Sequence, residues 1–227
     1  MTDTTDHAGT THGDEAGRTG TDEPVRAAVR STTSARWAAL AAVVAALVPA
    51  LGVVGVWADQ TIGGSWTYGP VARVLGVVGL LAGVVTAVLA ARRGDRATLG
   101  FGLAAVALPL GVLVASVLHP VAAVLLLLAR VLLVAFGVVV ALRSTGARRV
   151  AGWSVTVGAG VWLLSEIGMD VLFRFWIPPQ EALLPFFTVP QVGQFVGFVA
   201  AALLFVPPLV RPVGAGLRRL WATADVR

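Results

Sequence analysis

The chain has 227 residues, of which 57% are hydrophobic and 13% charged, and its formal net charge is +5. A soluble domain of this length has no core that could bury so much apolar surface, so the composition favours a membrane protein. The absence of cysteine excludes disulfides, thiolate metal sites and cysteine nucleophiles. All 17 basic residues are arginine, and with the excess of Ala, Val, Gly and Leu this indicates a GC-rich bacterial genome.

Residues 1–33 have the composition of a disordered cytoplasmic tail. They are rich in Thr, Asp and Gly and carry few large apolar side chains, so little offsets the entropy cost of folding. His7 and His12 lie among acids, a pattern that a solvated tail explains better than a loose metal site. The first apolar run is long and has no cleavage site after a short core, so it predicts a membrane span and not a signal peptide.

Six continuous apolar runs follow, each about as long as an α-helix must be to cross a bilayer, roughly 20 residues. Continuous runs predict helices, whereas barrel strands would alternate apolar and polar residues. We therefore predict an all-α, polytopic bundle of six transmembrane helices over residues 34–212, with a short tail at 213–227 that contains an amphipathic turn. The predicted spans are residues 37–57, 71–91, 97–118, 121–142, 150–172 and 191–210.

The arginines predict the orientation of these spans. The loops at 58–70, 119–120 and 173–190 contain only Arg174, whereas thirteen arginines lie in the flanks and loops at the opposite ends of the spans. By the positive-inside rule, both termini are cytoplasmic and the chain lies in the bacterial plasma membrane. Because the arginines adjoin hydrophobic spans, we expect the lipid bilayer as their partner and not nucleic acid.

Prolines inside the apolar runs predict helix distortions. Pro49, Pro109 and the pair Pro207–Pro208 each remove a backbone hydrogen bond, so we expect kinks there. Residues 178–190 contain four prolines, and we expect a loop that lies in the outer interface or caps the bundle. Only His119 and Pro120 separate the third and fourth runs, which predicts a tight antiparallel pair of helices.

Two GxxxG patterns predict close helix contacts. Gly79 and Gly83 form one of them, and Gly193 and Gly197 form the other. Such spacing lets two helix backbones approach each other closely. We favour packing inside the bundle over a homodimer seam.

Charges inside the apolar runs are the main candidates for function. Arg130 lies near the middle of its run, where an unpaired charge costs roughly 2.5–3.5 kcal/mol. Glu166 lies in the outer third of the fifth run, so we predict an Arg130–Glu166 ion pair. Asp170 and Arg174 are four residues apart, which favours a second pair along the same helix.

These charges define a candidate intramembrane polar site in the outer half of the bundle. It is either a pocket for a small solute or lipid headgroup, or a structural ion-pair network that joins the second, fourth and fifth spans. A metal site formed by its histidine and two acids lacks the spacing of any known motif. The candidate residues are Arg73, His119, Arg130, Glu166, Asp170 and Arg174.

The motifs of several enzyme classes are missing from the sequence. There is no GxxxxGK[ST], HExxH or GxSxG, and no cofactor is predicted. We therefore favour a non-catalytic integral membrane protein that is an accessory or scaffold subunit of a membrane complex, with other membrane proteins as partners. The main alternative is a small transporter in which Glu166 is the coupling carboxylate and Arg130 its counter-charge. A lipid-modifying enzyme that uses Glu166 or Asp170 as acid or base is the least favoured hypothesis.

Overall fold

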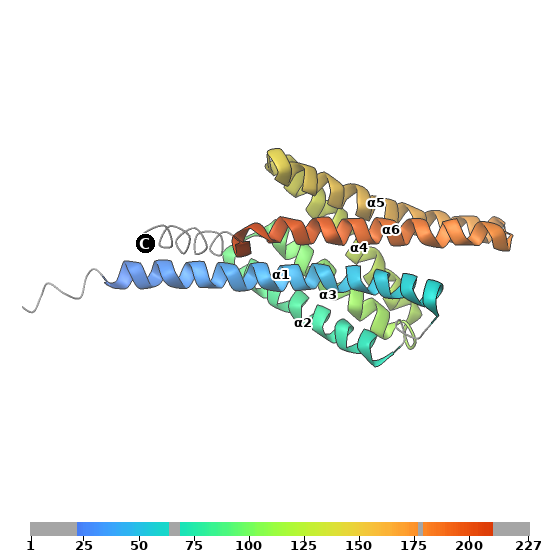
Figure 1. Ribbon diagram of the computed structural model, residues 1–227, viewed down its shortest axis with the longest axis horizontal. Helices are drawn as coiled ribbons and strands as arrows, with labels where there is room; N and C mark the ends of the chain where they lie inside the picture. Colours follow the sequence, from blue (N-terminus) through green and yellow to red (C-terminus); the bar gives the residue numbers. More distant parts are fainter. Residues whose placement is uncertain (1–21, 64–68, 177–178, 211–227) are drawn as a thin grey trace, which may run out of the picture. The chain divides into compact units, whose positions relative to one another are not determined.

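The computed structural model describes residues 22–63, 69–176 and 179–210, and within these ranges the chain is helical without strands. The chain divides into two units, residues 1–35 and residues 36–227, and the second unit contains the helical bundle. Figure 1 shows the helices in chain order. They are α1 (Asp22–Ile62), α2 (Pro70–Arg93), α3 (Arg96–Val114), α4 (His119–Arg143), α5 (Gly146–Phe175) and α6 (Gln180–Phe205).

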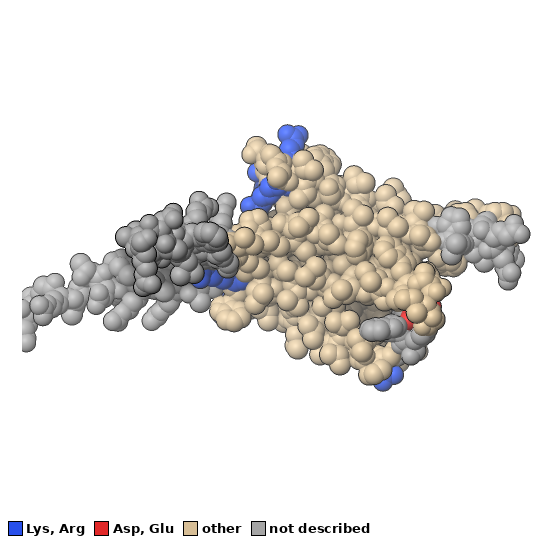
Figure 2. Space-filling view, viewed as in Figure 1, with Lys and Arg blue, Asp and Glu red and all other residues tan. Residues whose placement is uncertain are grey.

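Six helical segments are long and apolar enough to cross a membrane, which confirms the all-α fold with six membrane-type helices. On the face drawn in Figure 2, charged side chains lie near the edges of the described bundle and a broad uncharged zone lies between them. This distribution is the one expected for a surface in contact with lipid. The segments are Ser34–Ile62, Pro70–Arg93, Arg96–Val114, His119–Arg143, Gly146–Phe175 and Phe186–Val210.

The structure describes only the last part of the predicted tail at residues 1–33. Helix α1 begins at Asp22, so residues 22–33 are helical, while residues 1–21 lie outside the described residues. Asp22 and Glu23 favour the positive end of the helix dipole, and Pro24 is tolerated in a first helical turn. Arg and Ala at residues 26–30 favour helix, and α1 continues through the weaker helix formers at 31–34, so it begins before the predicted span.

The prediction of a loop at 178–190 is wrong for most of that range. Helix α6 begins at Gln180, after Pro179 at its N-cap, and continues through Pro185 and Pro190. The prolines suggested a break because each removes one backbone hydrogen bond. Membrane helices tolerate this loss where neighbouring groups satisfy the freed carbonyl. Residues 213–227, including the predicted amphipathic turn, lie outside the described residues.

The helices are continuous at two of the other predicted proline kinks and interrupted at the third. Pro49 and Pro109 lie within α1 and α3, which are continuous around them. The pair Pro207–Pro208 interrupts the last span, because α6 ends at Phe205 and a bend at Val206 precedes a further helical turn. Helix α3 ends at Val114, before the predicted end at residue 118.

Glycines bring consecutive helices into backbone contact. A Cβ placed on Gly158 of α5 would lie 2.5 Å from the Gly197 nitrogen of α6, and one placed on Gly193 would lie 2.7 Å from the Gly158 oxygen. Gly83 of α2 faces the α3 backbone at Ala105 in the same way. Both predicted GxxxG patterns therefore pack inside the bundle.

Aromatic side chains connect helices that are distant in sequence. Phe101 of α3 lies 5.2 Å, between ring centroids, from both Phe136 of α4 and Phe205 of α6. At the other end of α6, the Trp57 indole nitrogen of α1 donates to Gln191 Oε1 over 2.7 Å, and its ring packs on Phe195. Phe136 of α4 also stacks on Phe205, with ring centroids 5.8 Å apart. Helix α6 thus contacts α1, α3 and α4 as well as α5.

Helices α2 and α5 are the most peripheral of the six. Only 22% of the apolar window of each is buried within the bundle, less than in any of the other four. Helix α5 packs against α4 and α6, and α2 packs against α3. The outer faces of both helices are therefore free to contact lipid or another protein.

Candidate functional site

Arg130 provides the positive charge at the centre of the candidate site. It lies near the middle of α4, a helix rich in Leu, Val and Ala that begins at His119 with Pro120 in its first turn. Its side chain is only 13% exposed, on the face of α4 that meets α5. Burial at this depth removes water from the guanidinium, so the group needs partners supplied by protein.

Glu166 of α5 is the ion-pair partner of Arg130, as the sequence predicted. Glu166 Oε1 lies 3.0 Å from Arg130 Nη2. The two helices are brought together nearer their connecting turn, where a Cβ on Gly152 would lie 2.7 Å from the Ala141 nitrogen. The glycine contact sets the spacing of α4 and α5, and the ion pair joins them further along.

Trp162 completes the site and was missed by the sequence reasoning. The Arg130 guanidinium carbon lies 4.8 Å from the centroid of the Trp162 ring, close enough for a cation–π interaction. Trp162 is 4% exposed and packs on Phe198 of α6. Its position one turn before Glu166, on the same face of α5, is the signal that could have identified it.

The described residues do not satisfy all the polar atoms of the site. Among the described residues, the buried Nε of Arg130 has no hydrogen-bond partner. The Glu166 side chain is 37% exposed although it lies along a membrane-type helix. The Arg130 Nε–H therefore remains without an acceptor among these residues. The exposed part of the Glu166 carboxylate can accept a further hydrogen bond from a group outside the bundle.

Asp170 and Arg174 form the second predicted pair. Arg174 Nη2 donates to Asp170 Oδ2 over 2.7 Å, and both side chains are 68% exposed. An exposed i,i+4 pair of this kind contributes only about 0.3–0.5 kcal/mol. It lies near the end of α5, so it does not require burial in protein.

The remaining two candidate residues are not brought to this site. Arg73 and His119 are exposed, and Arg73 belongs to α2, which packs on α3 and not on α5. The predicted network joining the second, fourth and fifth spans is therefore reduced to the Arg130–Glu166 contact between α4 and α5. Within the described ranges, no group of three metal-binding side chains comes together, so His119, Glu166 and Asp170 form no metal site.

Arg130 is fixed by an ion pair on one side and an aromatic ring on the other. Comparison with known proteins gives no relative, because no family model, curated protein or solved structure matches this chain.

Proposed function

We propose that this protein is a non-catalytic integral membrane subunit that binds another membrane protein laterally, through the side of the bundle where Glu166 is exposed. The partner contributes a transmembrane helix with a hydrogen-bond donor at the depth of Glu166. The observation that carries the proposal is the 37% exposure of a carboxylate that is otherwise paired inside the bundle. A charge exposed to hydrocarbon is costly, and a second helix removes that cost.

The depth of Glu166 supports this proposal. Glu166 lies seventeen positions after Arg149 along α5, which corresponds to about 25 Å at 1.5 Å per residue. If Arg149 lies at the headgroups, the carboxylate lies inside a hydrocarbon core about 30 Å thick. Water therefore does not solvate its exposed part as it does the Asp170–Arg174 pair.

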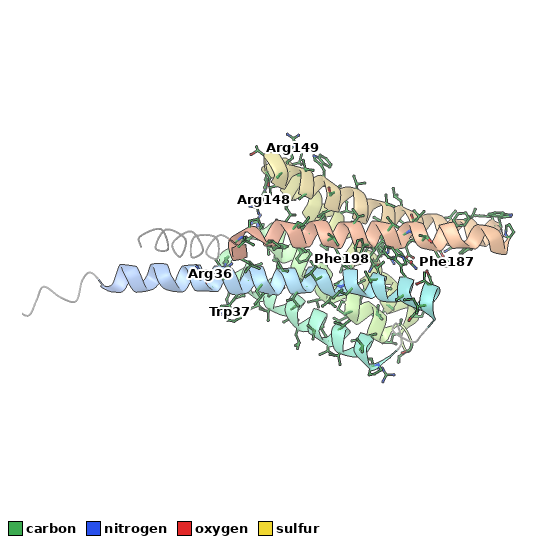
Figure 3. All side chains as sticks on the ribbon, viewed as in Figure 1. Arg36, Trp37, Arg148, Arg149, Phe187 and Phe198 are labelled. Atoms are coloured by element: carbon green, nitrogen blue, oxygen red, sulfur yellow. The ribbon has the colours of Figure 1, made fainter. Side chains whose placement is uncertain are left out.

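We also propose that the arginine-rich end of the bundle is cytoplasmic and that the chain lies in a bacterial plasma membrane. Figure 3 shows Arg36, Arg148 and Arg149 toward one end of the molecule and Phe187 toward the other. An excess of arginine on one side is the signal that orients bacterial membrane proteins. Both termini then lie in the cytoplasm.

Substituting Glu166 by glutamine tests the lateral partner. The tagged full-length chain is purified from native membranes in a mild detergent, and the proteins that accompany it are identified and quantified. We expect a defined membrane protein with the unaltered chain, and about tenfold less of it with Glu166→Gln. The amide keeps the shape of the side chain and an acceptor for Arg130, but it loses a charge-assisted hydrogen bond to the partner.

Asp170→Asn is the matched control, one turn further along α5. It removes an exposed carboxylate and should leave the amount of partner unchanged. Recovery of the chain alone from native membranes would contradict the proposal. Solute flux by the purified chain in liposomes, abolished by Glu166→Gln while the folded yield persists, would support the transporter alternative in its place. That alternative draws on the same ion pair and on the helix break at Val206.

A further inference from the structure

The turn between α4 and α5 presents a dense positive charge at one end of the bundle. Helix α4 ends at Arg143 and α5 begins at Gly146, with Arg148 and Arg149 in its first turn. All three arginine side chains are exposed, and residues 143–149 contain no acid. Figure 3 shows Arg148 and Arg149 projecting from the beginning of α5.

The other basic turn in the described bundle, between α2 and α3, is different. Asp95 lies among its arginines and caps α3, because its carboxylate accepts from the Thr98 hydroxyl over 2.6 Å and from the backbone nitrogens of Ala97 and Thr98. Its negative charge offsets part of the surrounding positive charge. The α4–α5 turn has no such acid and is the stronger site for an anion.

An apolar stripe on α5 begins next to these arginines. Val150, Trp153 and Val157 are 67%, 42% and 61% exposed, and their spacing of three and four residues places them on one face of the helix. From Val150 to Val157 the helix rises by about 10 Å, roughly a third of the thickness of the hydrocarbon core. A tryptophan at this level is typical of the boundary between headgroups and acyl chains.

We propose that this surface, formed by Arg143, Arg148, Arg149, Val150, Trp153 and Val157, binds an anionic phospholipid of the adjoining leaflet. The arginines contact the phosphate and the charged headgroup, and one acyl chain lies along the stripe. Charge complementarity selects an anionic lipid over a zwitterionic one. The guanidinium fork also matches the geometry of phosphate oxygens. This site is separate from Glu166 and does not depend on the proposed partner.

Native mass spectrometry of the full-length chain measures this binding. The chain in detergent is titrated with dioleoyl phosphatidylglycerol or with dioleoyl phosphatidylcholine, and bound lipids are counted. We expect phosphatidylglycerol to bind more tightly, and the triple variant R143Q/R148Q/R149Q to weaken its binding by about tenfold or more. The matched triple variant R92Q/R93Q/R96Q should weaken it by less than threefold.

Glutamine at these positions could impair insertion of the chain into the membrane, so two further measurements separate that effect from the loss of lipid binding. The variant R143K/R148K/R149K preserves charge and should retain most of the preference for the anionic lipid. The thermal midpoint without added lipid reports whether each variant is folded. Equal binding of both lipids, or equal losses from the two glutamine triples, would show that no lipid site exists at the α4–α5 turn.

Discussion

Reversing the charge of Arg130 by Arg130→Glu should destabilise the bundle by about 3–5 kcal/mol. The substitution places two carboxylates at a contact where Arg130 Nη2 and Glu166 Oε1 are now 3.0 Å apart. It also removes the guanidinium from the Trp162 ring. The free energy of unfolding is measured by titrating sodium dodecyl sulfate into the protein in mild detergent micelles. Glu166→Arg should show a loss of similar size, because it places two guanidinium groups together.

The double variant R130E/E166R separates the ion pair from other effects of substitution. It restores opposite charges at the same two positions, so it should be more stable than either single variant by at least about 1 kcal/mol. Full recovery is not expected, because a glutamate on α4 makes no cation–π contact with Trp162. The exposed pair is the control, and Arg174→Glu should cost less than about 1 kcal/mol. Equal losses for Arg130→Glu and Arg174→Glu would contradict the role of the buried pair.

Gly158→Ala is expected to destabilise the bundle by about 1–3 kcal/mol through overpacking. The added methyl group would lie 2.5 Å from the Gly197 nitrogen and 2.8 Å from the Gly193 oxygen, and both atoms belong to the backbone of α6. Backbone atoms cannot rotate away as a flexible side chain can, so the two helices must separate. The same detergent titration measures the loss.

Gly160→Ala is the matched control, two residues further along α5. A Cβ at Gly160 meets nothing within 4 Å, so only the helix propensity changes. Alanine is favoured over glycine in a helix by about 0.5–1 kcal/mol, so this variant should be as stable as the unaltered chain or more stable. If both substitutions had the same sign and size, the close contact between α5 and α6 would not hold.

The six apolar helices and the Arg130–Glu166 pair could be predicted because they depend on the length of each apolar run and on the depth of each charge along its helix. A run of about 20 apolar residues has few alternatives to a spanning helix. Arg130 lies deeper than Glu166, but its long side chain can reach outward, and two opposite charges on consecutive helices tend to meet because each alone is costly in lipid. Depth along each helix can be counted from the sequence, and the length of the arginine side chain covers the difference.

The position of Arg73, the start of α6 and the role of Trp162 could not be predicted from depth along a helix. Arg73 was included in the candidate site because a network joining the second, fourth and fifth spans was one hypothesis, but α2 packs on α3 while α5 packs on α4 and α6. The order of helices around the bundle decides this, and counting along the chain does not give it. The early start of α6 at Gln180 was missed because prolines such as Pro185 usually end helices in soluble proteins. Trp162 was missed because an aromatic residue in an apolar run resembles any other core residue.

Cysteine accessibility in intact cells tests the membrane arrangement most directly, since the chain contains no cysteine of its own. Single cysteines at His119 and Thr145 probe the two ends of α4, and both residues are exposed. A membrane-impermeant maleimide should label His119→Cys in intact cells, and Thr145→Cys only after the membrane is permeabilised. Labelling of Thr145→Cys in intact cells while His119→Cys is protected would contradict the proposed orientation. Equal labelling of both positions in intact cells would contradict the claim that α4 crosses the membrane.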